Sequence, residues 1–304
     1  MKKHAEFSAI LTMVSIFFLS ACASTKKKEL PTPYESHTPI SSTPLVLAPI
    51  PPVSVPLEND IYPEKVPNPD QVVLILGPGM VQGYSCVGIL KALHEMKVPI
   101  RSIYASEVCA WVSAAYLTQP TLNRMDWALM QVGEDSLFKA KTGLRIESVE
   151  NRLEQKLKSI FGERQLEELN PPLSIPLKDK ESGEIHLFQK GKIREVIRAA
   201  LSTPNGLSPG KIDGRLYSSA SLDSAYPFQT ARKTEGYPIF LFEIEKMNPA
   251  FQPELISLGI DRVSVPVRHL PNHDYKKRNE AIYLGKKATQ EAKAQIFERL
   301  GRTE

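Results

Sequence analysis

The chain has 304 residues, of which 42% are hydrophobic and 24% are charged, and its formal net charge is +4. This composition is typical of a globular protein, because it supplies apolar surface for a core and too little charge for disorder. It excludes a collagen, a coiled coil and a disulfide-rich scaffold. With no basic block, nucleic acid is not an expected partner. Two counts stand out: prolines (25) outnumber glycines (16), and the cysteines are three, an odd number.

The N-terminus has the features of an export signal. Lys2 and Lys3 precede an apolar stretch over 7–19, which suits a signal peptide and is short for a membrane span. The stretch ends in Leu19-Ser20-Ala21-Cys22, which resembles a bacterial lipobox. We therefore expect residues 1–21 to be a lipoprotein signal peptide and Cys22 to carry the lipid anchor. The alternative is an ordinary signal peptide with a chance cysteine.

A proline-rich segment follows the cysteine. Residues 22–70 hold eleven of the 25 prolines, and such a sequence favours extended conformations that hold a domain away from a bilayer. We expect a lipidated tether there. The alternative for its apolar part at 45–55 is that it lies along the domain surface. Two or more acyl chains make a stable membrane anchor. Because Ala23 and not Asp follows Cys22, we expect the outer membrane of a bacterial cell envelope.

Two strand–turn–helix units open the remaining residues, 71–304. The first runs from the apolar residues 71–76 through a glycine-rich turn into a helical pattern, and the second repeats this scheme over 99–117. Successive units of this kind predict an α/β fold with a mostly parallel sheet and helices on its faces. Further strands are expected at 173–177, 185–189, 216–218 and 239–244, and helices at 149–160, 193–201 and 276–300.

Six motifs in this part resemble those of patatin-like phospholipases, in the family's order. The first two are the glycine-rich run 76–83 with the helix start at 88–93, similar to G-G-G-x-R-G and G-V-L-x-x-L, and the elbow segment 103–116. The others lie at 184–191, 197–204, 212–217 and 226–232. The resemblance covers about residues 71–245, and six weak motifs in order are specific together. It implies a three-layer α/β/α sandwich that hydrolyses acyl esters without a cofactor or metal.

The family's catalytic pair is a serine in G-x-S-x-G and an aspartate in D-G-[GA], and this chain departs from both. The elbow reads Ala105-Ser106-Glu107-Val108-Cys109, so Glu107 stands in the position of the nucleophile. Counting back from Pro227 by the family's spacing puts Ser219 in the position of the aspartate. A carboxylate repels a developing oxyanion, and a serine is no base for it. The sequence therefore predicts a degenerate dyad.

The glycine-rich loop would supply the backbone N–H groups that hold the oxyanion in this family. Here it contains Gly77, Gly79 and Gly83, and the family's arginine is replaced by Gln82. Cationic support for the oxyanion is thus missing as well.

Four other residues are alternative catalytic groups. Ser106 is one residue early for the elbow tip, Asp213 fits the turn before the acid better than the acid itself, and Asp223 has no obvious nucleophile to serve. Cys109 is two residues late, and a buried cysteine is more often a small core residue. A disulfide between Cys86 and Cys109 stays open from the sequence.

Neither the histidines nor the tryptophans indicate a site. His269 and His273 are four apart, but Pro271 between them argues against a helix that would align them on a metal, and we expect both on the surface. Trp111 and Trp127 are expected in the core or lining a pocket. No metal is expected.

The sequence thus leads to three hypotheses. The first is a catalytically inactive patatin-like domain on a membrane-anchored lipoprotein, which keeps a phospholipid- or acyl-binding role. The second is an active acyl-ester hydrolase with an unorthodox nucleophile. The third is a regulator that binds a protein partner in the envelope.

Overall fold

The fold is described from a computed structural model over residues 70–302, without residues 120, 133–145, 204–205, 221–227, 229–230, 232–235 and 247–248. The expected signal peptide, Cys22 and the tether up to residue 69 lie outside these described residues. Within the described ranges, none of the helices combines the length and apolar character needed to cross a bilayer.

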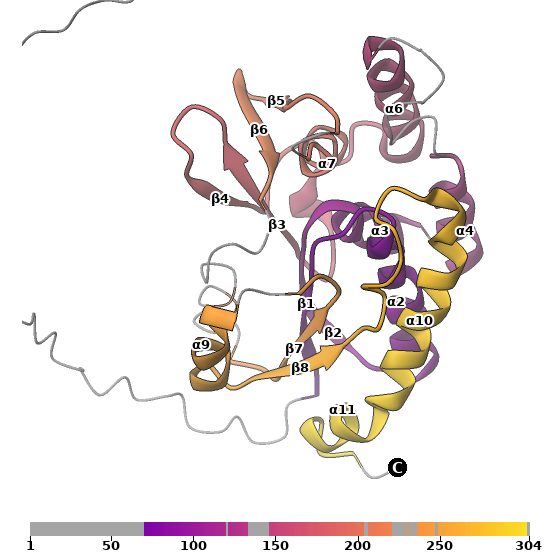
Figure 1. Ribbon diagram of the computed structural model, residues 1–304, viewed down its shortest axis with the longest axis vertical. Coiled ribbons are helices and arrows are strands. Elements are labelled where there is room, and N and C mark those ends of the chain that lie inside the picture. The colour runs from indigo at the N-terminus through magenta and orange to yellow at the C-terminus, as the bar shows by residue number, and fades with distance from the viewer. Residues whose placement is uncertain are drawn as a thin grey trace, which may run out of the picture. The chain divides into compact units, whose positions relative to one another are not determined.

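An eight-stranded sheet forms the centre of the domain (Figure 1). Its strands follow the order β5-β6-β3-β2-β1-β7-β8, with β4 paired to β3. The parallel strands are β1 (Val72–Leu76), β2 (Ile100–Ala105), β3 (Leu173–Asp179), β7 (Ile239–Glu243) and β8 (Ile260–Ser264). The antiparallel additions at the β3 end are β4 (Ile185–Phe188), β5 (Gly210–Ile212) and β6 (Arg215–Ser219). The sheet is mixed and mostly parallel, which confirms the predicted α/β class.

Helices cover both faces of this sheet (Figure 1). The longer ones are α2 (Ser85–Glu95), α3 (Glu107–Thr118), α4 (Leu122–Met130), α6 (Ile146–Phe161), α7 (Ile193–Ala200) and α10 (Arg278–Glu291). Shorter ones are α9 (Gln252–Ser257), α11 (Lys293–Arg299) and the 3-10 turns η1 (Gln82–Tyr84), η2 (Leu166–Glu168), η3 (Pro249–Phe251) and η4 (Tyr275–Lys277).

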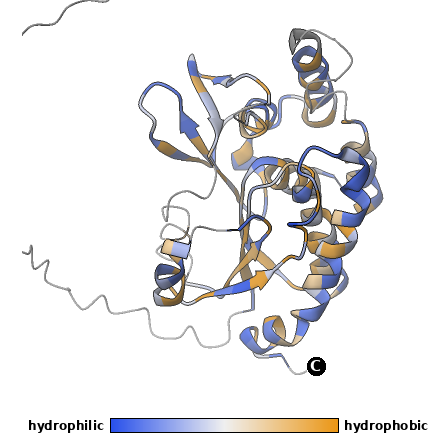
Figure 2. Cartoon of the chain, in the orientation of Figure 1, coloured by the Kyte–Doolittle hydropathy of each residue, from blue (hydrophilic) through white to orange (hydrophobic). Residues whose placement is uncertain are grey.

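The central strand β1 is buried on both sides. Val72, Leu74 and Leu76 belong to the large core under α2, α3 and α10, whereas Val73 and Ile75 belong to a smaller core with Leu255 of α9 and Phe228. Side chains alternate between the faces of a strand, so a continuous apolar run is what a strand covered on both faces requires. Figure 2 shows hydrophilic and hydrophobic residues sharing the flanking helices, as expected for helices with one buried side.

Two glycines allow α2 and α10 to cross in direct contact. A Cβ atom on Gly88 would lie 1.9 Å from the carbonyl oxygen of Ile282, and one on Gly285 would lie 2.1 Å from that of Ser85. Neither distance is tolerable for a carbon atom beside backbone. The crossing fixes α2, whose N-terminal side continues the glycine-rich loop of the candidate site.

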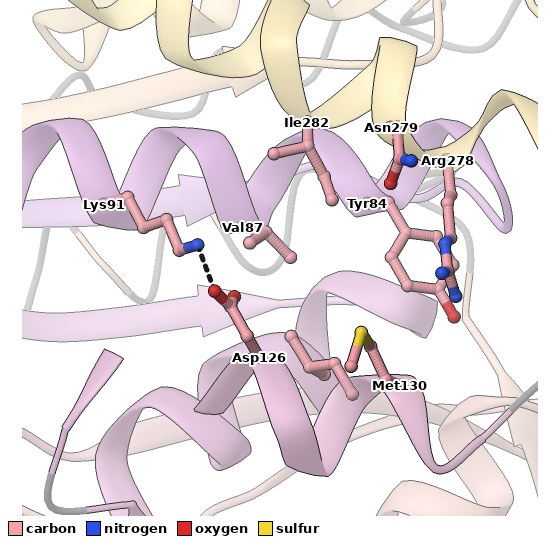
Figure 3. Close-up of a pocket in the computed structure, with 9 residues that line it drawn as sticks. Tyr84, Val87, Lys91, Asp126, Met130, Arg278, Asn279 and Ile282 are labelled. Atoms are coloured by element: carbon pink, nitrogen blue, oxygen red, sulfur yellow. Dashed lines mark hydrogen bonds and ion pairs between the residues drawn. The ribbon is translucent and has the colours of Figure 1, made fainter. Parts of the chain in front are cut away.

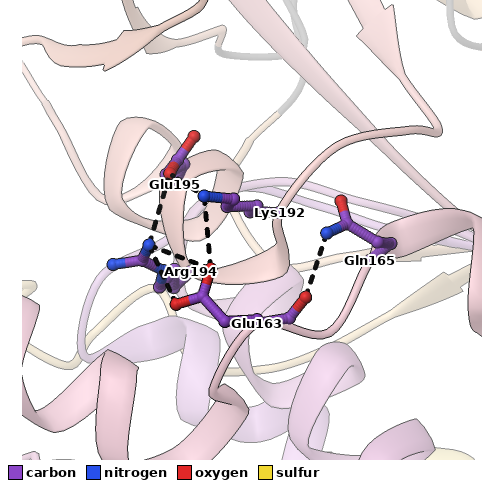
Figure 4. A network of polar contacts seen from close by, with 5 residues as sticks. All are labelled: Glu163, Gln165, Lys192, Arg194 and Glu195. Atoms are coloured by element: carbon purple, nitrogen blue, oxygen red, sulfur yellow. Dashed lines mark hydrogen bonds and ion pairs between the residues drawn. The ribbon is translucent and has the colours of Figure 1, made fainter.

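A surface network joins the end of α6 to the start of α7 (Figure 4). Glu163 accepts from Lys192 at 3.2 Å and from Arg194 at 3.1 Å, and its carbonyl oxygen accepts from the Gln165 amide at 2.9 Å. The Glu163 side chain is mostly exposed, so these ion pairs contribute little stability.

The observed elements depart from the sequence predictions in four places, two of which are the short elements β5 and α9, which were not expected. The helix expected at 276–300 is two helices, because the chain bends at Ala292 between α10 and α11. Strand β8 was not expected, since Asp261 and Arg262 interrupt its apolar pattern.

Candidate active site

The turn after β2 has the geometry of a nucleophile elbow. Ser106 is extended (φ −119°, ψ 153°), and Glu107, the first residue of α3, lies in the left-handed region with φ +52°. A non-glycine residue at positive φ is uncommon and costs backbone energy, so the surrounding structure must hold it there. Glu107 therefore stands at the tip of a strained strand-to-helix turn, at the carboxyl edge of the parallel sheet.

Three segments distant in sequence meet at the Glu107 carboxylate. Its Oε2 accepts a hydrogen bond from the backbone N–H of Gly79 at 2.8 Å, in the loop after β1. Its Oε1 accepts from the hydroxyl of Ser219, the last residue of β6, at 3.1 Å. The structure thus brings together the two residues that the sequence analysis singled out, with the serine as donor and the carboxylate as acceptor.

The backbone amides of the glycine-rich loop already have acceptors. Gly79 N–H is bonded to Glu107, and the N–H groups of Met80 and Gln82 point to Oδ1 of Asn272 at 2.8 and 3.4 Å. Pro78 has no N–H to offer. Three of the donors that this loop could present to an oxyanion are therefore engaged by side chains of the chain itself.

Gln82, which replaces the expected cation, has a structural contact. Its Nε2 donates to the carbonyl oxygen of Leu270 at 2.7 Å, so its side chain ties the loop to the segment after β8. Gly83 packs directly on the start of α3, where an added Cβ would lie 2.9 Å from Cβ of Val108. Gly77 faces the end of β7 in the same way, with Phe242 O 3.3 Å from an added Cβ.

The surroundings of Glu107 raise its pKa from 4.5 to about 7. Burial is the largest cause, because it disfavours the charged form, and the carboxylate of Glu245 adds repulsion. The hydrogen bonds from Gly79 and Ser219 act in the opposite direction. The Glu107 carboxyl group therefore titrates near neutral pH.

A disulfide bond joins Cys86 of α2 to Cys109 of α3, with Cα atoms 5.6 Å apart. The sequence left this pairing open. The bond occupies the thiol of Cys109, which removes it as an alternative nucleophile in this state, and it fastens the helix after the glycine-rich loop to the helix after the elbow.

A family model described as Patatin-like phospholipase matches residues 74–232, which is just over half of the chain. The chain belongs to the patatin-like phospholipase family. This match confirms the resemblance of the six motifs, and with the mixed, mostly parallel sheet and its flanking helices it confirms the patatin fold.

Curated relatives share the family at low identity. An uncharacterized NTE family protein of Mycobacterium tuberculosis is 26% identical over 164 residues, covering 52% of this chain and 44% of that protein. The patatin-like phospholipase domain-containing protein 7 of Rattus norvegicus is 24% identical over 181 residues, covering 57% of this chain and 13% of that protein. The chain therefore spans less than half the length of these relatives. Among solved structures, VipD from Legionella pneumophila has a TM-score of 0.43 at 10% identity, covering 76% of this chain and 67% of VipD.

Other candidates from the sequence lie apart from the Glu107–Ser219 contact or outside the described residues. Ser106 is 1% exposed, and its hydroxyl has no hydrogen-bond partner among the described residues. Asp213 is in the tight turn between β5 and β6, at φ +47°. His269 and His273 are exposed, as expected, and His269 pairs with Glu280. Asp223 lies outside the described residues. No cluster of metal-binding side chains occurs in the described part of the chain.

Asn272 is the site residue that sequence reasoning missed. It accepts from two amides of the patatin glycine-rich loop, and its Nδ2 donates to Glu245 at 3.5 Å. No motif surrounds it, and it is about 190 residues away from the loop in sequence. Only the path of the chain after β8 brings it to the site.

A separate hollow of about 240 Å³ lies between α2, α4 and α10 (Figure 3), and its lining includes neither Glu107 nor Ser219. Lys91 and Asp126 bridge it with an ion pair of 2.5 Å. Trp111 is fully buried, as expected, whereas Trp127 is 62% exposed on α4 and lies outside the core. Trp127 lies on the outer side of an amphipathic helix whose buried positions are Met125, Ala128 and Leu129.

Proposed function

We propose that this protein is a patatin-like lipoprotein of the bacterial cell envelope whose domain binds a phospholipid or acyl ligand without hydrolysing it. One observation carries the proposal: the Glu107 carboxylate accepts hydrogen bonds from Gly79 N–H and from Ser219. An acyl hydrolase of this family would need a hydroxyl at the first position and a carboxylate at the second. Here the two groups have exchanged places.

The exchange opposes ester hydrolysis in two ways. Oxyanion holes stabilise a negative oxygen with preorganised N–H donors. Glu107 Oε2 already occupies the Gly79 donor, and Asn272 occupies that of Met80. An ionised Glu107 would also repel the negative charge that develops on an ester carbonyl. The N–H donors of Gly79 and Met80 are therefore bonded to side chains of the protein itself.

The hydrolytic part is tested with the purified full-length protein and a phosphatidylglycerol that carries a fluorescent acyl chain. We expect the lipid to bind and to be recovered intact. Release of the fluorescent fatty acid would contradict the proposal if Glu107→Gln abolished that release, and absence of lipid binding would contradict the ligand-binding part.

The envelope location rests on the lipobox-like Leu19-Ser20-Ala21-Cys22 and the proline-rich tether. Cys22→Ala should abolish incorporation of labelled palmitate and release the protein from the membrane fraction. Ser20→Ala keeps a small residue before the cysteine and should be labelled like wild type. Equal labelling of Cys22→Ala and wild type would overturn the anchor.

A second candidate function is favoured by the direction of one hydrogen bond. Ser219 donates to Glu107, and a carboxylate with a pKa of about 7 is suited to take a hydroxyl proton at neutral pH. In this reaction Glu107 takes the proton, Ser219 Oγ attacks the acyl carbonyl, and the ester C–O bond breaks as Glu107 returns the proton to the leaving alcohol. Water then hydrolyses the acyl-serine. A fluorophosphonate probe should then label wild type and not Ser219→Ala. Absence of labelling in both variants would remove this candidate.

A further inference from the structure

A second pocket lies at the same edge of the sheet, at the ends of β7 and β8. It has a volume of about 260 Å³ and is lined by polar and charged side chains of Glu243, Lys246, Gln252, Arg262, Ser264 and Arg268. Glu243 ends β7 and Ser264 ends β8, which pair in parallel. The carboxyl edge of an open α/β sheet is the place where ligands most often bind in such folds.

One buried carboxylate organises two arginines in this pocket. Oε2 of Glu243 accepts from Arg262 at 2.7 Å, and its Oε1 accepts from Arg268 at 2.9 Å. The Glu243 side chain is only 6% exposed, whereas the two arginine side chains are 34% and 45% exposed. The carboxylate thus lies beneath the guanidinium groups and orients them, and each guanidinium, with five N–H donors, has more donors than this contact uses.

The lining has more positive than negative charge. Three cationic side chains, Lys246, Arg262 and Arg268, face one carboxylate. Lys246 makes no ion pair within the described part of the chain. Glu243 neutralises one of these three positive charges, so an excess of two positive charges is left for a ligand. Ser264 and Gln252 add a hydroxyl and an amide, both of which can donate to oxygen.

We propose that this pocket binds a phosphoryl group. Oriented guanidinium groups match the geometry of phosphate oxygens, and a lysine adds a mobile charge. A phosphate monoester can carry two negative charges, which balances the excess of two in the lining, and the phosphodiester of a lipid head group carries one, which balances half of it. The phosphoryl group belongs either to a lipid head group or to a soluble phosphate ester. The proposal does not depend on the chemistry of Glu107 and Ser219, since neither residue lines the pocket.

Calorimetry on the purified full-length protein distinguishes the two sources. The soluble probes are inorganic phosphate and glycerol 1-phosphate, and the head-group probe is dihexanoyl phosphatidylglycerol below its micelle concentration. Saturable binding of the soluble probes assigns the pocket to phosphate esters, and binding of the lipid alone assigns it to a head group. Binding that Lys246→Gln and Arg268→Gln weaken belongs to this pocket, which separates this result from the outcome at the elbow.

Variants then locate the bound probe. Lys246→Gln removes a cation with no ion-pair partner among the described residues, so the fold should be unaffected, and Arg268→Gln leaves Arg262 to neutralise Glu243. Each should weaken binding by about ten- to a hundredfold, the worth of one charged hydrogen bond. Ser264→Asp should abolish binding by adding a negative charge.

The matched control is Arg299→Gln, which removes an arginine paired at 2.7 Å with Asp261, outside the pocket lining. It should bind like wild type. Absence of saturable binding for all three probes would overturn the proposal, and so would equal affinities of wild type, Lys246→Gln and Arg268→Gln.

Discussion

Glu107 and Glu243 are two carboxylates at the same edge of one sheet, and they differ in the charge of the groups around them. Glu107 accepts from a backbone amide and a hydroxyl and lies near the carboxylate of Glu245, and its pKa rises to about 7. Glu243 is held between two arginines. The comparison teaches that the charge of the partners, more than the position in the fold, decides what a buried carboxylate does. Glu107 titrates near neutral pH, whereas Glu243 orients two guanidinium groups.

The largest expected effect comes from removing the carboxylate that has cationic partners. Glu243→Ala should lower the free energy of unfolding by about 3 kcal/mol, because it leaves two arginines without their charged hydrogen bonds. Urea denaturation at pH 7 measures it. Glu107→Ala is the matched variant and should cost less, since it removes a carboxylate that burial and Glu245 already disfavour. Equal losses of unfolding free energy in the two variants would contradict the different roles assigned to Glu107 and Glu243.

The pH dependence of stability should separate Glu107 from its neutral isostere. A carboxyl whose pKa is higher in the folded state stabilises the fold below its unfolded value of 4.5 and loses this contribution as the pH rises to about 7. Across that window, wild type should therefore lose up to about 3 kcal/mol relative to Glu107→Gln. Urea denaturation at pH 4.5 and pH 8 gives the difference. The same pH slope in both proteins would show that Glu107 titrates normally.

Asn272 should have an intermediate effect. Asn272→Ala leaves the amide of Met80 without its acceptor and should cost about 1–2 kcal/mol. Asn279→Ala, an exposed asparagine on α10, is the control and should stay within about 0.5 kcal/mol of wild type. If the two variants were equally stable, the glycine-rich loop would not depend on Asn272.

Ser219→Ala should have the smallest effect on stability, about 1 kcal/mol or less, because it removes one hydrogen bond and little volume. Its sharper signature is the pKa of Glu107, which should rise further, since the hydroxyl bond stabilises the charged form. A midpoint of the pH-dependent stability that moves downward would contradict the assigned donor and acceptor.

The sequence predicted the start of the domain well and the end less well. The apolar run of β1 and the glycines after it predict a strand and a turn from local rules alone. β8 was missed because Asp261 and Arg262 point to neighbours, Arg299 and Glu243, that no local pattern reveals. The apolar periodicity of a segment predicts which of its residues are buried. It does not predict charged residues in a strand that ion-pair with distant parts of the fold.

The candidate site was predictable in its residues and not in its contacts. Motif spacing pointed to Glu107 and Ser219, but the hydrogen bond between them spans 112 residues. Asn272 carried no signal, since an asparagine in a loop fits almost any role. The phosphoryl pocket was invisible for the same reason: Lys246, Arg262 and Arg268 look like ordinary surface charges until the sheet brings them around Glu243.

The most direct test of the central claim, that the exchanged pair leaves this patatin-like domain without ester hydrolysis, is turnover of a short-chain acyl ester by purified full-length protein at pH 8, where Glu107 is ionised. The account predicts that wild type, Ser219→Ala and Glu107→Gln all hydrolyse the ester at the rate of the buffer. Turnover by wild type that disappears in both variants would contradict it and establish Ser219 as a nucleophile activated by Glu107.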